Sequence, residues 1–300
     1  MPATLTTHSN ALNEVFLPKY QEAVFYNSDV LRYFGSPKPH PGGGRYVNWQ
    51  VHSAAAGTTA IYNESSIMPS ASNETVVNAY VSPVYIWDTV QISGILKDAL
   101  GSGGHYDAFD TEIGGKINSI KDLFETSFLA STYGLELAVD SSSDYAGITR
   151  SSASYFQSTE TAVSAALSVA DLRDLIESCK DNDKGGLRKP LWMVPWNQYS
   201  NIWSLTGSPG TKFFSNKDPL ENYSNQMLDN APVVPVADMT DTVILALDMR
   251  PELWRYEEFR PLTITEHNKS GDSDVYLLTA ALSLACLNPK MHGKLTGVTA

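Results

Sequence analysis

Hydrophobic and polar positions alternate at the start of a long strand-forming stretch, residues 46–93. Residues 47–51 read Val-Asn-Trp-Gln-Val, and this period of two indicates a half-buried strand. Strand-forming residues return at 75–81 and 84–92, and Pro83 between them favours a sheet edge or a bend. We therefore predict a long hairpin. Because a two-stranded ribbon is only marginally stable in water and no core partner is near in sequence, we expect it to rest on another surface.

A second pattern, with hydrophobic residues three and four positions apart, predicts a helix over residues 107–133. Its stripe consists of Phe109, Ile113, Ile117, Ile120, Leu123, Phe124 and Phe128. Asp107 can cap the helix, and Gly114 and Gly115 weaken it without breaking it. At a rise of about 1.5 Å per residue the helix would be roughly 40 Å long. We expect a structural spine rather than a connecting helix.

Shorter patterns divide the rest of the chain into mixed helix and strand, so the expected fold class is α+β. Helical spacing over residues 11–34 ends at the Pro- and Gly-rich residues 36–44, for which we expect no regular structure. Residues 134–158 are serine-rich and loop-like. A helix is expected to start at Ser168, because Asp171 three residues later completes a variant of the capping box. We also expect a buried strand at 191–195, a helix at 196–205, and strands at 232–238, 242–249, 253–259, 261–267, 274–288 and 294–298.

Composition limits the classes of protein. The 300 residues are 42% hydrophobic, which is enough for a sizeable core, and the net charge of −12 argues against a binder of nucleic acid or anionic membranes. Cys179 and Cys286 form neither a CxxC motif nor a disulfide framework, so we expect buried reduced thiols. Residues 1–16 lack the features of a signal peptide, and no segment approaches about 18 uninterrupted apolar residues. We expect synthesis in a cytoplasm and no membrane association.

No group of residues has the spacing of a catalytic or metal site. The six histidines are His8, His40, His52, His105, His267 and His292, and we expect most of them at surfaces or interfaces. They form no HExxH or comparable zinc motif. Residues 114–119 lack the spacing of a phosphate loop, and residues 181–186 lack the bidentate glutamate of a calcium loop. We therefore predict no catalytic residues, no cofactor and no metal, and a protein that is not an enzyme.

The order of elements resembles the major capsid protein of tailed bacteriophages, which has the Hong Kong 97-like fold. The segment IYNES around Glu64, followed by VSPVYIWDTVQISG, resembles the extended loop of that family as it returns toward the spine helix. EIGGKINSIKDLFETSFLAST resembles the spine helix itself. The resemblance implies an N-terminal arm at 1–44, an extended β-hairpin loop at 45–93, a peripheral domain at 94–140 and 259–300, and an axial domain at 141–258.

The resemblance also implies a function. Such subunits form pentamers and hexamers of an icosahedral head around packaged double-stranded DNA, together with a scaffolding protein and a portal. A hairpin without its own core can lie across a neighbouring subunit, so we expect Trp49, Glu64, Tyr85 and Trp87 at subunit interfaces. The low charge of residues 46–93 suits an interface core. The expected location is the virion.

One departure from the family pattern concerns covalent cross-linking. Some members join subunits by an isopeptide bond from a lysine of the extended loop, whereas residues 46–93 contain no lysine. We expect non-covalent maturation or clamping by a separate cement protein. Because few residues precede the hairpin and they carry no long charged coiled-coil pattern, we expect the scaffolding protein to be separate.

Three other hypotheses remain at this point. An encapsulin, the shell protein of a bacterial nanocompartment, shares the same fold and is the nearest alternative. A secreted β-rich adhesin could use the four sequons at Asn63, Asn73, Asn222 and Asn268. A soluble enzyme has the least support, because no constellation of residues favours it.

Overall fold

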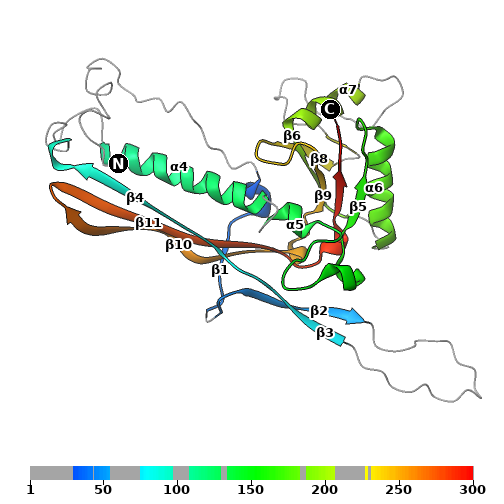
Figure 1. Ribbon diagram of the computed structural model, residues 1–300, viewed down its shortest axis with the longest axis horizontal. Coiled ribbons are helices and arrows are strands. Elements are labelled where there is room, and N and C mark those ends of the chain that lie inside the picture. Colours follow the sequence, from blue (N-terminus) through cyan, green and yellow to red (C-terminus); the bar gives the residue numbers. More distant parts are fainter. Residues whose placement is uncertain are drawn as a thin grey trace, which may run out of the picture. The chain divides into compact units, whose positions relative to one another are not determined.

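The computed structural model describes residues 30–42, 44–54, 75–96, 108–129, 134–182, 187–206, 227–228 and 231–299. The chain forms two compact units. Unit 1 consists of Met1–Pro41, Pro83–Ser127 and Tyr256–Ser283, and unit 2 of Gly42–Ser82, Phe128–Arg255 and Leu284–Ala300. Both units mix helices with sheets, as the α+β prediction requires (Figure 1).

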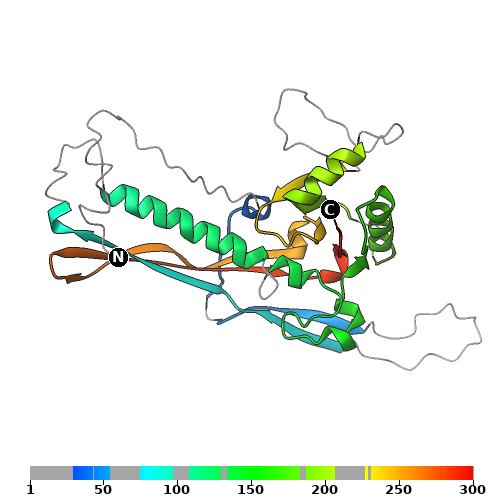
Figure 2. The same cartoon turned by 45° about the horizontal axis from the view of Figure 1, so that its top comes forward.

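Unit 1 is built on a four-stranded sheet with the order β1-β10-β11-β4. The strands are β1 (Lys38–Pro39), β4 (Val84–Ser93), β10 (Trp254–Ser270) and β11 (Ser273–Cys286). The helix α4 (Ala108–Leu129) runs along the three long strands in both views (Figures 1 and 2). Its Ile113, Ile120, Phe124 and Phe128 are buried, so most of the predicted stripe faces inward. Leu123 was also predicted in the stripe but is 51% exposed. The short helix α2 (Leu31–Phe34) also belongs to this unit.

Two predictions about proline-containing segments were wrong. Residues 36–44 were expected to lack regular structure, but β1 pairs in parallel with β10 there, and the His40 N–H donates to the Glu258 carbonyl (2.9 Å). Proline is tolerated because β1 is an edge strand. The strands expected at 253–259 and 261–267 are one strand, β10. The β1 pairing ends at Glu258, so among the described residues one edge of β10 is open where Pro261 lies.

The predicted hairpin is present, but only for its first two strands. In unit 2, β2 (Val47–Ala54) pairs antiparallel with β3 (Thr75–Val81), with a register shift near His52. This pair is called the β2–β3 ribbon below. After Pro83 the chain enters β4, which pairs antiparallel with β11 and not with the ribbon. Residues 55–74, where the hairpin would turn, lie outside the described residues.

The remainder of unit 2 is centred on a six-stranded sheet with the order β5-β12-β9-β6-β8-β7. Its strands are β5 (Thr159–Ala162), β6 (Pro190–Pro195), β7 (Met227–Leu228), β8 (Ala231–Val236), β9 (Ile244–Asp248) and β12 (Gly293–Thr296). The helices are α5 (Leu135–Ala138), α6 (Val169–Asn182) and α7 (Trp196–Thr206), with 3-10 turns η1 (Arg150–Ser152), η2 (Ser154–Phe156), η3 (Pro251–Leu253) and η4 (Pro289–Met291). The strand predicted at 191–195 and the helix predicted at 196–205 are confirmed.

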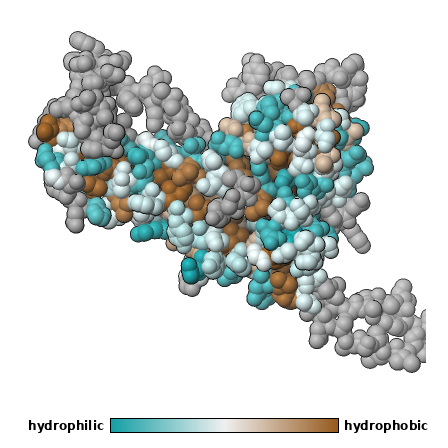
Figure 3. All heavy atoms as spheres, viewed as in Figure 1, coloured by the Kyte–Doolittle hydropathy of each residue, from teal (hydrophilic) through white to brown (hydrophobic). Residues whose placement is uncertain are grey.

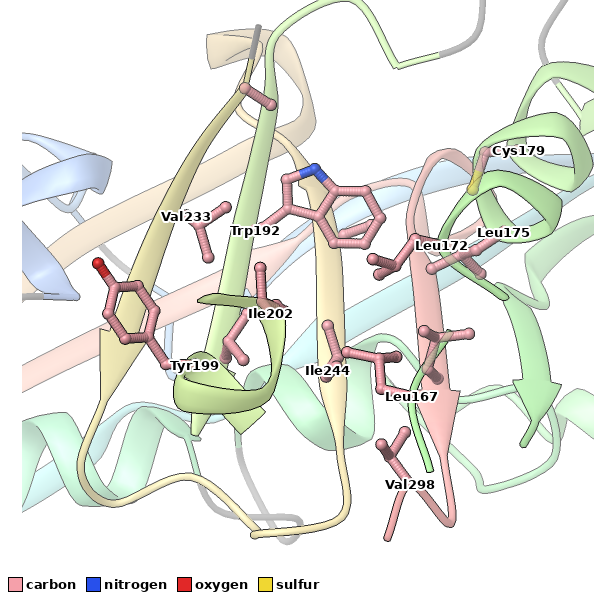
Figure 4. Close-up of a cluster of buried hydrophobic side chains, with 14 residues drawn as sticks. Leu167, Leu172, Leu175, Cys179, Trp192, Tyr199, Ile202, Val233, Ile244 and Val298 are labelled. Carbon is pink, nitrogen blue, oxygen red and sulfur yellow. The ribbon is translucent and has the colours of Figure 1, made fainter. Parts of the chain in front are cut away.

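The core of unit 2 packs α6 and α7 against this sheet. Figure 4 shows Trp192 of β6 in the middle of the cluster, with Leu172 and Leu175 of α6 on one side and Ile202 of α7 on the other. The capping box at the start of α6 is confirmed, because the Ser168 hydroxyl and backbone N–H both donate to the Asp171 carboxylate (2.6 and 2.9 Å).

Candidate assembly surfaces

The two faces of β4 differ sharply in exposure. Ile86, Val90 and Ile92 are buried, and the Asp88 carboxylate lies 2.9 Å from the Lys116 ammonium of α4. The even-numbered positions therefore face α4. Tyr85 and Trp87 point to the opposite face and are 67% and 70% exposed. No other large hydrophobic side chain among the described residues is as exposed.

Threonines of the neighbouring strands continue this outward face across the sheet. Trp87 of β4 lies opposite Thr279 of β11, and the Thr279 hydroxyl lies 2.9 Å from that of Thr263 in β10. The sheet thus presents two aromatic rings beside a row of hydroxyl groups. On the molecular face drawn in Figure 3, hydrophobic residues form several separate patches among pale and teal ones. A sheet face with exposed aromatic rings can bind a partner, since such rings bury about 150–250 Å² each.

The four residues expected at interfaces fall in different places. The structure brings Tyr85 and Trp87 together on the uncovered face of β4. Trp49 lies on β2 in unit 2 and is half-buried, and its indole N–H donates to the Leu287 carbonyl (3.1 Å). Part of its surface is therefore already used within its own chain. Glu64 lies outside the described residues.

Residues 134–158, expected to be loop-like, contain a buried cation that was not predicted. The guanidinium of Arg150 is fully buried and donates to the carbonyls of Leu137, Ala138 and Asp140. The first two of these carbonyls belong to the last turn of α5, where a cation is favourable. The segment is thus an ordered part of the core.

A buried ion pair lies next to this cation. The Lys294 ammonium donates to the Asp140 carboxylate (2.9 Å) and to the Glu136 carbonyl (3.2 Å). Burial alone would raise the pKa of Asp140. Hydrogen bonds from the Ser143 N–H, the Lys294 side chain and the Ser142 N–H outweigh burial and hold this pKa well below its ordinary value. Asp140 is therefore a carboxylate at any physiological pH.

His292 is an exception to the expectation that most histidines lie at surfaces or interfaces. It is fully buried, its Nδ1 accepts the Asp248 N–H (3.0 Å), and its ring lies 4.7 Å from that of Trp254. Burial, helped by the charge of Arg250, lowers the pKa of His292 to about 3. The ring is a neutral core group rather than a ligand or a catalytic base.

The described residues offer surfaces and no reaction centre. They contain no cluster of metal-binding side chains. Both cysteines are free and buried as expected, and burial raises the pKa of Cys179 to about 11 and that of Cys286 to about 12, so neither is a nucleophile at neutral pH. Among the described helices, none has the length and hydropathy to cross a bilayer.

Comparison with known proteins gives one family and one fold. The family described as SU10 major capsid protein matches residues 30–299. The cyanophage A-1(L) capsid asymmetric unit superposes with a TM-score of 0.75 at 14% identity, covering 99% of this chain and 100% of the other. The asymmetric unit of the bacteriophage PhiM1 mature capsid gives 0.65 at 12% identity, covering 94% and 91%.

An encapsulin has the same fold. The holo-SrpI encapsulin complex from Synechococcus elongatus PCC 7942 superposes with a TM-score of 0.65 at 12% identity, covering 99% of this chain and 96% of the other. No curated protein matches significantly. The Hong Kong 97-like resemblance is confirmed at the level of the fold.

Proposed function

Because this chain belongs to the SU10 major capsid protein family, we propose that its copies assemble into the pentamers and hexamers of an icosahedral head that encloses packaged double-stranded DNA. Membership makes it a structural protein of the bacteriophage capsid, located in the virion, and not an enzyme. The net charge of −12 fits a shell that encloses DNA without binding it tightly.

The exposed face of β4 is the observation that supports assembly through this surface. Tyr85 and Trp87 stand on a sheet face that no described element covers, although burying each ring would contribute about 2 kcal/mol or more. We propose that a neighbouring subunit covers them with its own extended loop, which contains Trp49 and Glu64. Residues 46–93 carry no lysine or arginine, as expected for a segment buried between subunits.

We propose the domain assignment of the family for this chain. The N-terminal arm is 1–44, the extended loop 45–93, the peripheral domain 94–140 with 259–300, and the axial domain 141–258. In this assignment α4 is the spine helix, and its buried stripe along the long strands supports that role. The compact units divide the chain differently in two places. Unit 1 also includes β4, so the sheet of the peripheral domain would extend into the last part of the loop, and residues 128–140 and 284–300 belong to unit 2, where β12 pairs with β9.

We propose a separate scaffolding protein and a portal as further partners, with non-covalent maturation or a cement protein completing the shell. Expression of this chain alone and together with its scaffolding protein tests the first partner. Uniform closed shells only in the coexpression would support it, whereas efficient assembly of the chain alone would count against it.

An encapsulin-type compartment is the second candidate, favoured by the match to the holo-SrpI encapsulin. The family match favours a phage capsid instead. Microscopy of particles from infected cells separates the two candidates, because a phage head contains densely packed DNA and an encapsulin contains protein cargo.

The assembly surface is tested by replacing both exposed rings of β4. The double variant Tyr85→Ser with Trp87→Ser should fold, because neither ring is in the core, but should form few shells in electron micrographs. The control is Trp196→Ser, which removes a 55% exposed tryptophan from α7. Wild-type protein that stays monomeric with its scaffold would contradict shell formation. A double variant that assembles in wild-type yield would contradict the role of this face alone.

A further inference from the structure

A tight turn in the segment expected to be a loop has an unusual backbone. Two hydrogen bonds join Tyr145 and Ile148, one in each direction (3.2 and 2.9 Å), around the two residues Ala146 and Gly147. Both central residues have positive φ, 55° and 76°, as a type I′ turn requires. Alanine rarely adopts this conformation, so its surroundings must enforce it.

The base of the β2–β3 ribbon rests on this turn. The Tyr80 N–H of β3 donates to the Ala146 carbonyl (3.0 Å). The Tyr80 ring lies directly over Gly147, where an added Cβ would be only 2.4 Å from the ring atom Cε1. Tyr46 packs beside the same ring, with centroids 5.3 Å apart. A residue other than glycine at position 147 would therefore displace the ribbon or distort the turn.

The other strand of the ribbon is held by two more hydrogen bonds within unit 2. The Trp49 indole donates to the Leu287 carbonyl (3.1 Å), and the Arg255 guanidinium donates to the Asn48 carbonyl (3.3 Å). Val47 and Ala79, which belong to the two strands, are fully buried. The base of the ribbon is thus fixed on both strands, by residues from three separate parts of the sequence.

The turn itself is held from behind by the core. The Tyr145 hydroxyl accepts the Cys286 N–H (2.9 Å), and the Arg150 guanidinium lies 5.1 Å from the Tyr145 ring centroid. Phe156 stacks on the same ring at 6.2 Å. Buried groups that are hydrogen-bonded and packed in this way have little freedom to shift.

We infer that the 145–148 turn and Tyr80 set the direction in which the β2–β3 ribbon projects from the rest of unit 2, and thereby the place where it meets the neighbouring subunit. This inference rests on the proposed shell function. A strand of eight residues such as β2 extends by roughly 26 Å, so a small rotation at its base becomes a large displacement at its far end. Gly147 and Tyr80 are positioning residues, which act without touching the neighbour.

The test compares two glycine variants. Gly147→Ala introduces both an unfavourable φ and the collision with Tyr80. Gly297→Ala, in the same unit, introduces only the unfavourable φ of +68°, because the nearest atom to its Cβ would be 3.5 Å away. The exchange rate of the Tyr80 amide in unassembled subunits shows whether its hydrogen bond to Ala146 is formed. Electron microscopy shows the shape of the shells that each variant forms with scaffold.

We expect Gly147→Ala to speed exchange at the Tyr80 amide at least tenfold and to give open or irregular shells, whereas Gly297→Ala matches wild type in both measurements. Tyr80→Ser, which removes a half-exposed ring and leaves the turn unstrained, should reproduce both defects if Gly147→Ala does not fold. Unchanged exchange at residue 80 in either variant would overturn the inference. So would faster exchange with shells of wild-type shape. If wild type forms no shells, the proposed function fails, and exchange alone still decides whether the turn holds the ribbon.

Discussion

The imidazole of His292 accepts a hydrogen bond from the backbone N–H of Asp248 across 3.0 Å, and it does so in a fully buried site. Its Nδ1 must be unprotonated to accept this bond, and no described group pairs with its Nε2. This arrangement ties the stability of unit 2 to the neutral form of one histidine.

Acid should therefore destabilise the subunit through His292. Its folded pKa is about 3 and its ordinary value 6.5, so the unfolded chain binds the proton first. The contribution of neutral His292 to the free energy of unfolding is complete above pH 6.5. It is lost as the pH falls toward 3, by about 1.4 kcal/mol for each pH unit. Chemical denaturation of unassembled subunits at pH 7, 6 and 5 measures this slope.

The His292→Gln variant should lower that slope by the equivalent of about one proton, and His52→Gln, at an exposed position, is the control variant. If the wild-type subunit lost no stability between pH 6.5 and 5, or if both variants behaved alike, the buried neutral histidine would not be the cause.

Lys294 and Lys116 should differ strongly as ion-pair partners, although both ammonium groups lie 2.9 Å from a carboxylate. Lys294→Met leaves the buried Asp140 without its cation and should lower the free energy of unfolding by about 2–3 kcal/mol. Lys116→Met breaks the more exposed pair with Asp88 and should cost less than about 1 kcal/mol. Urea denaturation of the two variants checks this order. Equal losses of unfolding free energy in the two variants would mean that burial does not make the Asp140–Lys294 pair more important for stability than the exposed pair.

Elements that are stabilised by residues close in sequence could be predicted from local sequence patterns. The stripe of α4, apart from the exposed Leu123, and the Ser168–Asp171 capping box involve residues three or four apart, and both were predicted from spacing alone. Tyr85 and Trp87, two positions apart in a predicted strand, were expected at subunit interfaces, but no face of the sheet was assigned to them. Which face α4 covers depends on residues such as Lys116, so exposure could not be predicted.

Contacts between distant residues explain what the sequence did not reveal. The Tyr145 hydroxyl binds the backbone of Cys286, 141 residues away, and the 145–148 turn meets Tyr80 from a strand far earlier in the chain. Residues 134–158 were consequently predicted to be a loop, because their many serines suggest exposure although Tyr145, Arg150 and Phe156 among them are buried. The pairing of β4 with β11 was missed for the same reason.

The alanine of the 145–148 turn should be a site where glycine stabilises. Ala146 has φ of 55°, which costs an L-residue about 1–2 kcal/mol, whereas glycine adopts it freely. After the larger entropy of glycine in the unfolded chain is subtracted, Ala146→Gly should raise stability by about 0.5 kcal/mol. Ala153→Gly is the matched control, since Ala153 is equally buried at φ −123° and should lose about 1 kcal/mol. Thermal denaturation measures the stability of both variants. If Ala146→Gly is destabilising, the packing of the Ala146 methyl group contributes more to stability than the backbone strain costs.

Mature shells should come apart into single chains when boiled in detergent. An isopeptide bond forms when a lysine amine attacks an asparagine carboxamide and releases ammonia, and the extended loop that would carry the amine has no lysine between residues 46 and 93. Packing of rings such as Tyr85 and Trp87 and backbone hydrogen bonds must then hold the loop, and detergent with heat disrupts both. In purified DNA-filled particles this chain should therefore run as a single band near 32.8 kDa on a denaturing gel, with no multimer of it above. A ladder of multimers that survives boiling would show a covalent link elsewhere in the chain, and mass spectrometry of the cross-linked peptides would locate it.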